Sequence, residues 1–132
     1  YAGGFLYNPK ARAVLLHRRD DKTIFNPNKW AFFGGLNEAG ETPKQTFRRE
    51  LNEELGIEVS EREIKPLCDY FTKEHGIYRY AFFVESDLVK SRMRLDEGAG
   101  FEWVLIEKVF EYDLSEKSRK DLKVFLQLIN EK

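Results

Sequence analysis

Glutamates stand at set intervals between residues 35 and 57 of this chain. Glu50, Glu53 and Glu54 are spaced at i, i+3 and i+4, which places their carboxylates on one face of a helix. Three like charges within one turn repel one another, and a divalent cation bound among them would offset that cost. Ligands that are all oxygen favour magnesium or manganese over zinc or copper. The pattern therefore predicts a Mg²⁺ site in which Mn²⁺ can substitute.

An arginine and a pair of glycines accompany the carboxylates. Arg49 precedes Glu53 by four residues, so its guanidinium can reach that carboxylate and fix its orientation. Gly34 and Gly35 precede the loop that leads to the helix, and they let backbone carbonyls or amides approach a metal or a phosphate closely. The alternative is a glutamate-rich helix face that is merely solvated. The set spacing of Glu41, Gly35 and Arg49 favours the metal site.

A helix between Thr42 and Gly56 is expected to carry these carboxylates. Thr42 is a suitable N-cap, Pro43 fits the first helical position, and Gln45 completes a capping box. Gly56 is the expected C-terminal cap. Apolar residues at four-residue spacing supply the buried stripe, namely Phe47, Leu51 and Leu55.

Strand and turn signals surround this helix. Apolar runs at residues 5–7 and 13–16 flank the turn formers Asn8-Pro9-Lys10 and predict a hairpin. Another short apolar run lies at residues 30–33. Strands are expected at residues 67–73, 78–85 and 101–105, and a second helix at residues 115–130. This order favours an α/β fold in which a mixed sheet packs between helices.

The composition bounds the class of protein. With 132 residues, of which 42% are apolar and 34% charged, the chain suits one globular domain over residues 1–132. A net charge of −1 gives no general attraction to nucleic acids or anionic membranes. A single cysteine, Cys68, excludes an intramolecular disulfide and a multi-thiolate zinc site. Because no apolar run has the length of a membrane span and no secretory signal is visible, we expect a cytoplasmic protein.

The stretch from Gly35 to Ile57 resembles the Nudix box of the Nudix hydrolases, and every signature position is matched. Beyond the box, the chain is similar in length and in order of elements to the compact MutT-like members. The resemblance implies an α/β/α sandwich and an enzyme that uses Mg²⁺ to cleave nucleoside diphosphates linked to another group. In that chemistry, a cation neutralises pyrophosphate oxygens and orients a water for in-line attack on phosphorus.

The resemblance also implies roles for the box residues. Glu53 and Glu54 would be principal metal ligands, and Glu50 would be either a ligand or the base that orients the water. Gly35, or its neighbour Gly34, would offer a backbone carbonyl to the metal.

Four further residues receive roles in the same way. Arg49 would belong to the catalytic residues and hold a glutamate in place. Glu41 would lie near the substrate and support the loop or a further metal. Arg19 would bind a substrate phosphate; the alternative is a solvated strand end. Glu97 resembles a loop glutamate that approaches the metal or serves as base; the alternative is a simple polar loop.

The sequence departs from the family pattern at positions that concern the substrate. Phe33 stands where the family often has proline, and its ring is expected to leave the metal cluster intact but to reshape the floor of the cleft. Residues 112–118 lack the asparagine with which MutT-like enzymes read an oxidised guanine. Strand aromatics and His75 are candidates for substrate contact, with core packing favoured for each ring, namely Trp30, Phe33, Tyr70, Tyr78, Tyr80 and Phe82.

We therefore expect a Mg²⁺-dependent Nudix pyrophosphohydrolase that acts on a (d)NTP or on a small nucleoside diphosphate derivative. Its partner would be a small nucleotide rather than a nucleic acid polymer or a membrane, and it would be a monomer or a homodimer. One alternative is a nucleotide-binding sensor on the same fold without useful catalysis, which the retained box glutamates disfavour. Another is an isomerase of isoprenyl diphosphates, which needs a catalytic cysteine in the cleft; Cys68 is the only candidate.

Overall fold

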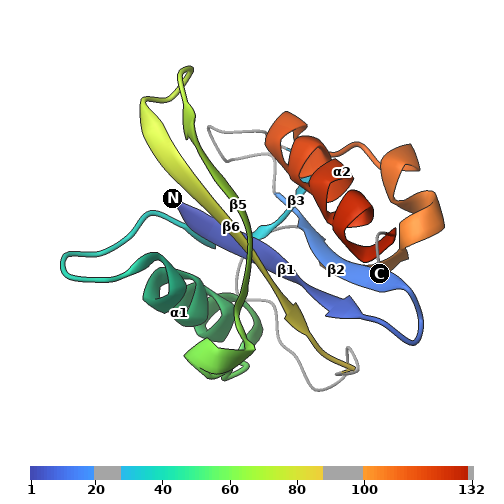
Figure 1. Ribbon diagram of the computed structural model, residues 1–132, viewed down its shortest axis with the longest axis horizontal. Coiled ribbons are helices and arrows are strands. Elements are labelled where there is room, and N and C mark those ends of the chain that lie inside the picture. Colours follow the sequence, from blue (N-terminus) through green and yellow to red (C-terminus); the bar gives the residue numbers. More distant parts are fainter. Residues whose placement is uncertain (20–27, 88–99, 131–132) are drawn as a thin grey trace.

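The computed structural model describes residues 1–19, 28–87 and 100–130, and Figure 1 shows how they are arranged. Within these residues, the strands are β1 (Ala2–Asn8), β2 (Ala13–Arg18), β3 (Trp30–Ala31), β4 (Phe33–Gly35), β5 (Lys65–Thr72), β6 (Ile77–Glu85) and β7 (Gly100–Leu105). The helices are α1 (Pro43–Leu55) and α2 (Glu116–Asn130), with short 3₁₀ segments η1 (Glu61–Glu63) and η3 (Ile106–Glu111).

The strands form one mixed sheet, as predicted. Its order is β3-β2-β1-β6-β5, while β4 also pairs with β1 and β7 with β2. β1 and β6 run parallel, with Gly4 opposite Phe82, and the other pairs are antiparallel. The predicted hairpin joins β1 to β2, because the Asn8 side chain accepts hydrogen bonds from the backbone of Lys10 and Ala11 at 3.0 and 3.2 Å. The strands predicted at residues 67–73 and 78–85 correspond to β5 and β6, which pair antiparallel.

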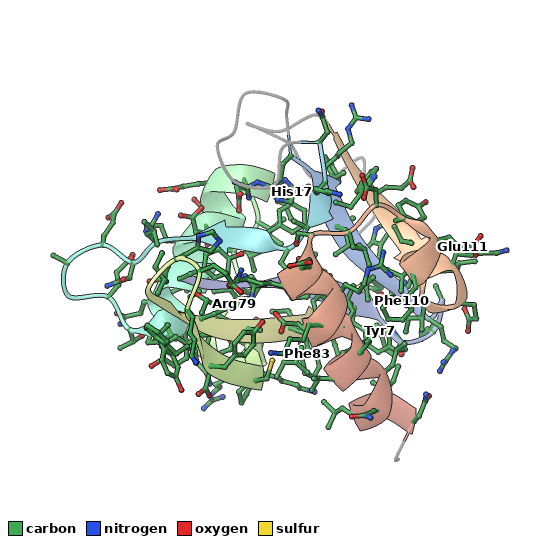
Figure 2. The ribbon with its side chains drawn as sticks, turned by 90° about the horizontal axis from the view of Figure 1, so that it is seen from above. Tyr7, His17, Arg79, Phe83, Phe110 and Glu111 are labelled. Atoms are coloured by element: carbon green, nitrogen blue, oxygen red, sulfur yellow. The ribbon has the colours of Figure 1, made fainter. Side chains whose placement is uncertain are left out.

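Helices cover both faces of the sheet, which confirms the predicted α/β architecture (Figure 1). Since successive side chains of a strand point to opposite faces, Leu6 packs on the α1 side while Phe5 and Tyr7 pack on the α2 side. The ring of Phe125 on α2 lies 4.9 to 5.0 Å from the rings of Phe5, Tyr7 and Phe83. Tyr7 and Phe83 are seen on the sheet beside α2 in Figure 2.

Helix α1 begins and ends where the capping signals predict. The Thr42 hydroxyl accepts from the backbone of Gln45, the Gln45 side chain accepts from the backbone of Thr42, and Gly56 ends the helix in the left-handed region at φ 69°. The stripe of Phe47, Leu51 and Leu55 is fully buried against the sheet.

The apolar run at residues 30–33 contributes to two strands, β3 and β4. Trp30 pairs with Arg18 at the end of β2, whereas Gly34 pairs with Gly3 at the start of β1. The chain thus passes from pairing with β2 to pairing with β1. This crossing brings the glycine pair beside α1. Neither helix that the structure describes is long and apolar enough to span a membrane.

Candidate active site

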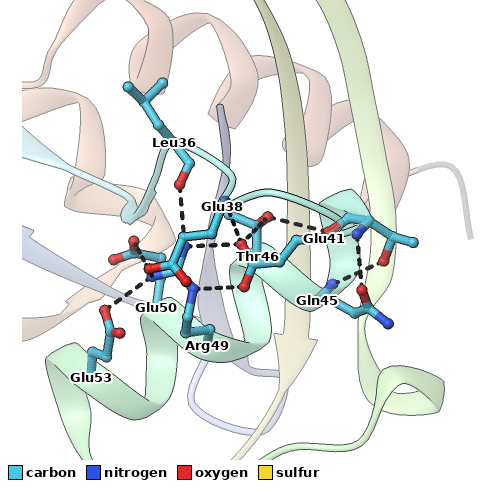
Figure 3. A network of polar contacts seen from close by, with 9 residues as sticks. Leu36, Glu38, Glu41, Gln45, Thr46, Arg49, Glu50 and Glu53 are labelled. Carbon is cyan, nitrogen blue, oxygen red and sulfur yellow. Dashed lines mark hydrogen bonds and ion pairs between the residues drawn. The ribbon is translucent and has the colours of Figure 1, made fainter.

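Arg49 lies at the centre of the carboxylate cluster, as Figure 3 shows. Its Nε and Nη2 donate to the two carboxylate oxygens of Glu41 at 2.7 and 3.1 Å. Its Nη1 donates to Glu50 Oε1 and Glu53 Oε2 at 3.1 Å each, which confirms the predicted contact with Glu53. Nη2 also donates to the Leu36 carbonyl at 3.2 Å. One guanidinium therefore ties the loop before α1 to the acidic face of the helix.

The three box carboxylates lie in different surroundings, and Arg49 is a partner that the sequence argument for a cation did not include at Glu50. Glu54 is only 4% exposed and accepts from the Gly34 backbone at 3.1 Å, whereas the side chain of Glu53 is 53% exposed. Arg49 offsets part of the repulsion that the sequence argument assigned to a metal. Within residues 1–19, 28–87 and 100–130, no three His, Cys, Asp or Glu side chains are grouped as an ion site.

The donor atoms nevertheless fit a hard divalent cation. Glu50 Oε1 and Glu53 Oε2 each lie 3.1 Å from the same nitrogen, Arg49 Nη1. The two carboxylates are therefore close neighbours. A Cβ on Gly35 would lie 2.5 Å from Glu50 Oε1, so that carboxylate rests directly against the Gly35 backbone. Mg²⁺ is usually held by one or two carboxylates together with water and substrate phosphates, rather than by an all-protein cage. Two carboxylates beside an open backbone match that requirement.

A cavity of about 260 Å³ is lined in part by Gly34 and Gly35. Four basic side chains line it, and none of its described lining residues is Asp or Glu; the four are Arg19, His75, Arg79 and Lys117. We call it the cationic cavity. Its composition suits a ligand rich in hydrogen-bond acceptors.

A second cavity of about 410 Å³ adjoins the first, with which it shares Tyr1, Leu36 and Ile77. Tyr78 and Tyr80 also line it, and their ring centroids lie 4.9 Å apart. Ligand pockets for small molecules commonly enclose roughly 300–1,000 Å³. The two adjoining cavities together therefore have the size that a nucleotide needs.

Backbone contacts fix the start of α2 at the cationic cavity. Trp30 donates to the Asp113 carbonyl at 2.8 Å, and Ser115 donates back to the Trp30 carbonyl at 2.9 Å. The Phe32 amide donates to the Ser118 hydroxyl at 3.3 Å. The region where MutT-like enzymes carry their asparagine thus does reach the cavity, and here it contributes Ser115, Lys117 and Ser118.

The structure places the remaining predicted site residues as follows. Arg19, and not the exposed Arg18, lies in the wall of the cationic cavity. Glu41 lines the second cavity, but its carboxylate already accepts from Arg49, from Thr46 at 3.0 Å and from the Glu38 backbone at 2.7 Å. These contacts tie Glu41 to the loop before α1 and to the helix. Glu97 lies outside the described residues.

Phe33 does not line the cleft that its ring was expected to reshape. Its ring is fully buried on the α1 side of the sheet, where it stacks on His17 at 4.7 Å, and it is not part of either cavity wall. Phe82 is likewise core, as favoured for each ring, whereas Tyr78 and Tyr80 line the second cavity.

Cys68 does not meet the requirement of an isoprenyl diphosphate isomerase. It lines neither cavity, and its sulfur lies 3.5 Å from the Asp121 carboxylate. Burial and that carboxylate raise the pKa of the Cys68 thiol to about 12, so it stays protonated at neutral pH.

Arg79, Lys117 and the two serines were not predicted as site residues. Arg79 occupies the same face of β6 as the buried Ala81 and Phe83, and a charged residue at a buried strand position was the available signal. Lys117 carried no such signal, because its place depends on where α2 begins in space.

Buried His17 leads to a prediction about stability in acid. Its Nε2 lies 2.9 Å from the Phe32 carbonyl, while Nδ1 has no hydrogen-bond partner among the described residues. Burial lowers the pKa of His17 from 6.5 to about 4. Because the unfolded chain binds the proton more readily, stability is complete above pH 6.5 and is lost as the pH falls toward 4. The loss is expected to reach roughly 2–3 kcal/mol.

Urea unfolding at pH 7 and at pH 4.5 measures this effect. His17→Gln, which does not titrate, is expected to flatten the dependence of unfolding free energy on pH. His75→Gln, at the chain's other and exposed histidine, is the matched control and should behave as the unmodified protein. An unchanged pH slope in His17→Gln would contradict the assignment.

Comparisons with known proteins identify the family. A family model described as the NUDIX domain matches residues 1–128. The nucleoside triphosphatase NudI of Escherichia coli O139:H28 is 32% identical in an alignment that covers 84% of this chain and 85% of the relative, and NudI of Shigella flexneri matches equally.

Solved structures show the same fold. A mutT/nudix family protein from Listeria innocua aligns with a TM-score of 0.80 at 20% identity, covering 98% of this chain and 92% of that one. A MutT protein from Methanosarcina mazei Go1 aligns with a TM-score of 0.76 at 24% identity, covering 99% and 94%. Nudix proteins in general use divalent metal ions and act on small nucleotides. With the family model matching nearly its whole length, this chain belongs to the Nudix family and is a Nudix hydrolase.

Proposed function

We propose that this protein is a Mg²⁺-dependent pyrophosphohydrolase that cleaves a (d)NTP or a small nucleoside diphosphate derivative by attack of water on phosphorus. One observation carries the proposal: the glycine pair that lines the cationic cavity also contacts carboxylates of α1, since the Gly34 amide donates to Glu54 and the Glu50 carboxylate lies beside Gly35. A phosphorylated ligand in the cavity would thus meet the acidic groups across Gly34 and Gly35. The name of the relative, a nucleoside triphosphatase, favours a nucleoside triphosphate.

Glu50, Glu53 and Glu54, with the Gly35 carbonyl and Glu97, are the groups proposed to hold the metal. When bound, the ion would neutralise pyrophosphate oxygens and acidify a coordinated water. Glu50, whose side chain is 12% exposed, lies deeper than Glu53 and would orient the water and accept its proton. Glu54 fixes the glycine pair through the Gly34 amide.

One basic residue of the cavity wall, Arg19, would bind a substrate phosphate. Arg19 follows directly after β2 and lies in the same wall as Gly34 and Gly35, so it is placed to bind a phosphate near the acidic groups. Arg49 would act as a positioning residue, because its donors hold the carboxylates of Glu41, Glu50 and Glu53.

A substrate panel tests the proposal. Nucleoside triphosphates and nucleoside diphosphate derivatives are incubated with Mg²⁺ in isotopically labelled water, and the products are read by mass. We expect hydrolysis of at least one nucleotide, with the label on one phosphorus and loss of activity when the metal is chelated. No turnover of any member at micromolar enzyme would overturn the proposal, and metal-dependent binding without hydrolysis would favour the sensor instead.

Gly35→Ala is expected to lower kcat at least about 10-fold, because near-attack geometry is sensitive to such shifts. A Cβ there would lie 2.5 Å from Glu50 Oε1 and must displace that carboxylate. Steady-state hydrolysis of the best panel substrate measures the effect. Gly40→Asn is the control, since a Cβ at Gly40 meets nothing within 4 Å and asparagine tolerates its φ of 83°. Equal kcat for Gly35→Ala and the unmodified enzyme would contradict the contact.

A further inference from the structure

Arg79 is a buried arginine that lines the cationic cavity together with Gly34 and Gly35. It is only 7% exposed and lies on β6, where Figure 2 labels it. Its Nε donates to Asp121 Oδ2 at 2.8 Å, and Asp121 on α2 is completely buried. The proposed hydrolysis of pyrophosphate assigns no role to either residue.

Surrounding groups hold the guanidinium of Arg79 in place. Its central carbon lies 4.7 Å from the Tyr1 ring centroid and 5.6 Å from that of Phe32. Its partner Asp121 is held in turn, because Tyr70 donates to the other carboxylate oxygen at 2.8 Å. A group fixed on several sides is preorganised for recognition, since little rotamer freedom remains to be lost when a ligand binds.

The charge of Arg79 is balanced by Asp121. A buried pair that is neutral as a whole offers little net attraction to a phosphate, but its N–H groups remain strong donors. A guanidinium carries five N–H donors and no acceptor. It therefore favours a neutral carbonyl oxygen and disfavours an amino group at the same position.

The neighbouring wall suits a flat, largely apolar ring. Ala31, Leu36 and Ile77 line the same cavity as Arg79. Lys117, which also lines it, is paired with Glu74 at 3.3 Å, so its charge is balanced as well. This part of the cavity is thus built for a ring that bears a hydrogen-bond acceptor.

We propose that Arg79 is a specificity-determining residue that donates to an oxo group on the substrate's base. The enzyme then prefers bases with an exocyclic oxygen, at position 6 of a purine or position 4 of a pyrimidine, over bases with an amino group there. Asp121 is the positioning residue that orients Arg79. This inference rests on the proposed function, because it concerns the nucleotide that the same site hydrolyses.

Two matched substrate pairs test the preference. ITP and ATP differ in oxygen against nitrogen at position 6, and UTP and CTP differ in the same way at position 4. The enzyme is tested on whichever of the two pairs, purine or pyrimidine, it hydrolyses. In that pair, kcat/KM for the nucleotide with the oxo group is expected to exceed kcat/KM for the nucleotide with the amino group at least about 10-fold. Equal values, or a preference for the amino member, overturn the inference. Absence of hydrolysis with every nucleotide instead overturns the proposed function.

Variants then connect the preference to Arg79. Removing Arg79 alone would leave Asp121 buried without a partner, so the double variant Arg79→Gln/Asp121→Asn is used, with folding checked by circular dichroism. Its oxo-to-amino ratio is expected to fall to about 1, mainly through a higher KM for the oxo member. If the double variant does not fold, Arg79→Lys decides, because it keeps the charge but loses the planar donor array and should lower the ratio several-fold. An unchanged ratio in the variant that folds overturns the inference.

Two controls separate specificity from catalysis. Lys123→Gln changes an exposed residue of α2 and should leave the ratio and the activity unchanged. Glu53→Gln should lower hydrolysis of both members of a pair by the same factor and leave the ratio unchanged. A ratio that collapses in Glu53→Gln would place the discrimination in the chemical step and would count against Arg79.

Discussion

Glu53→Gln is expected to lower kcat at least about 100-fold, equivalent to about 2.7 kcal/mol of transition-state stabilisation. The Glu53 side chain is 53% exposed and accepts a hydrogen bond from Arg49 Nη1 at 3.1 Å. It therefore contributes charge rather than packing. Glutamine keeps the shape but removes the negative charge with which a divalent cation would interact. Steady-state hydrolysis at saturating Mg²⁺ and nucleotide measures the loss.

Glu58→Gln is the matched control, because Glu58 is an exposed glutamate just beyond the end of α1. It should retain full kcat. Both variants should unfold at the temperature of the unmodified protein, so that a lower kcat reports chemistry and not loss of fold. Full activity in Glu53→Gln would show that the proposed metal role of this residue is wrong.

Arg49→Lys is expected to lower kcat about 100-fold, as Glu53→Gln does, and also to destabilise the protein. The guanidinium serves both oxygens of Glu41 and one oxygen each of Glu50 and Glu53, which a single ammonium group cannot reproduce. The carboxylates would then repel one another and lose their relative positions. Denaturant unfolding without metal, together with kcat, measures the two effects.

The pH dependence of stability gives Arg49→Lys a second readout. Hydrogen bonds from Arg49 and from the Glu38 backbone lower the pKa of Glu41 from 4.5 to about 2. A lowered carboxyl pKa contributes stability that is complete above pH 4.5 and is lost as the pH falls toward 2. Arg49→Lys should lose part of this contribution, so its stability should depend less on pH in that range.

Arg48→Lys is the control for both readouts, because Arg48 is the exposed neighbour of Arg49 on the same helix. It should match the unmodified protein in kcat, in the free energy of unfolding and in the dependence of that free energy on pH below 4.5. If Arg49→Lys behaved in the same way, the carboxylates would be held by other contacts, and Arg49 would not be the positioning residue of this site.

Local rules explain which parts of the fold were predictable. The bounds of α1 depend on Thr42, Pro43 and Gly56, whose capping roles are decided within a few residues of the chain. The hairpin of β1 and β2 depends in the same way on the turn formers Asn8, Pro9 and Lys10 between two apolar runs. The crossing from β3 to β4 was not predictable, because it depends on which strand each residue meets in the finished sheet.

The placement of the box glutamates along α1 was predictable, but the surroundings of each carboxylate were not. Spacing placed Glu50, Glu53 and Glu54 on one face, yet it could not show that Glu54 turns inward to the Gly34 amide. Helical spacing also revealed the contact from Arg49 to Glu53, while the stronger pairing with Glu41 depends on how the loop folds back. The pairing of Arg79 with Asp121 joins β6 to α2 over 42 positions of sequence and has no local signal.

The parallel pairing of β1 with β6 has a consequence for how the chain acquires its structure. Gly4 lies opposite Phe82, so the central strand pair forms only when a loop spanning more than half the chain closes. Such non-local pairing raises contact order and slows folding. During synthesis, the apolar hairpin of β1 and β2 must wait for β6 to emerge. A nascent chain that stops short of Ile77 therefore exposes an unpaired strand edge, and in that form aggregation is most favoured.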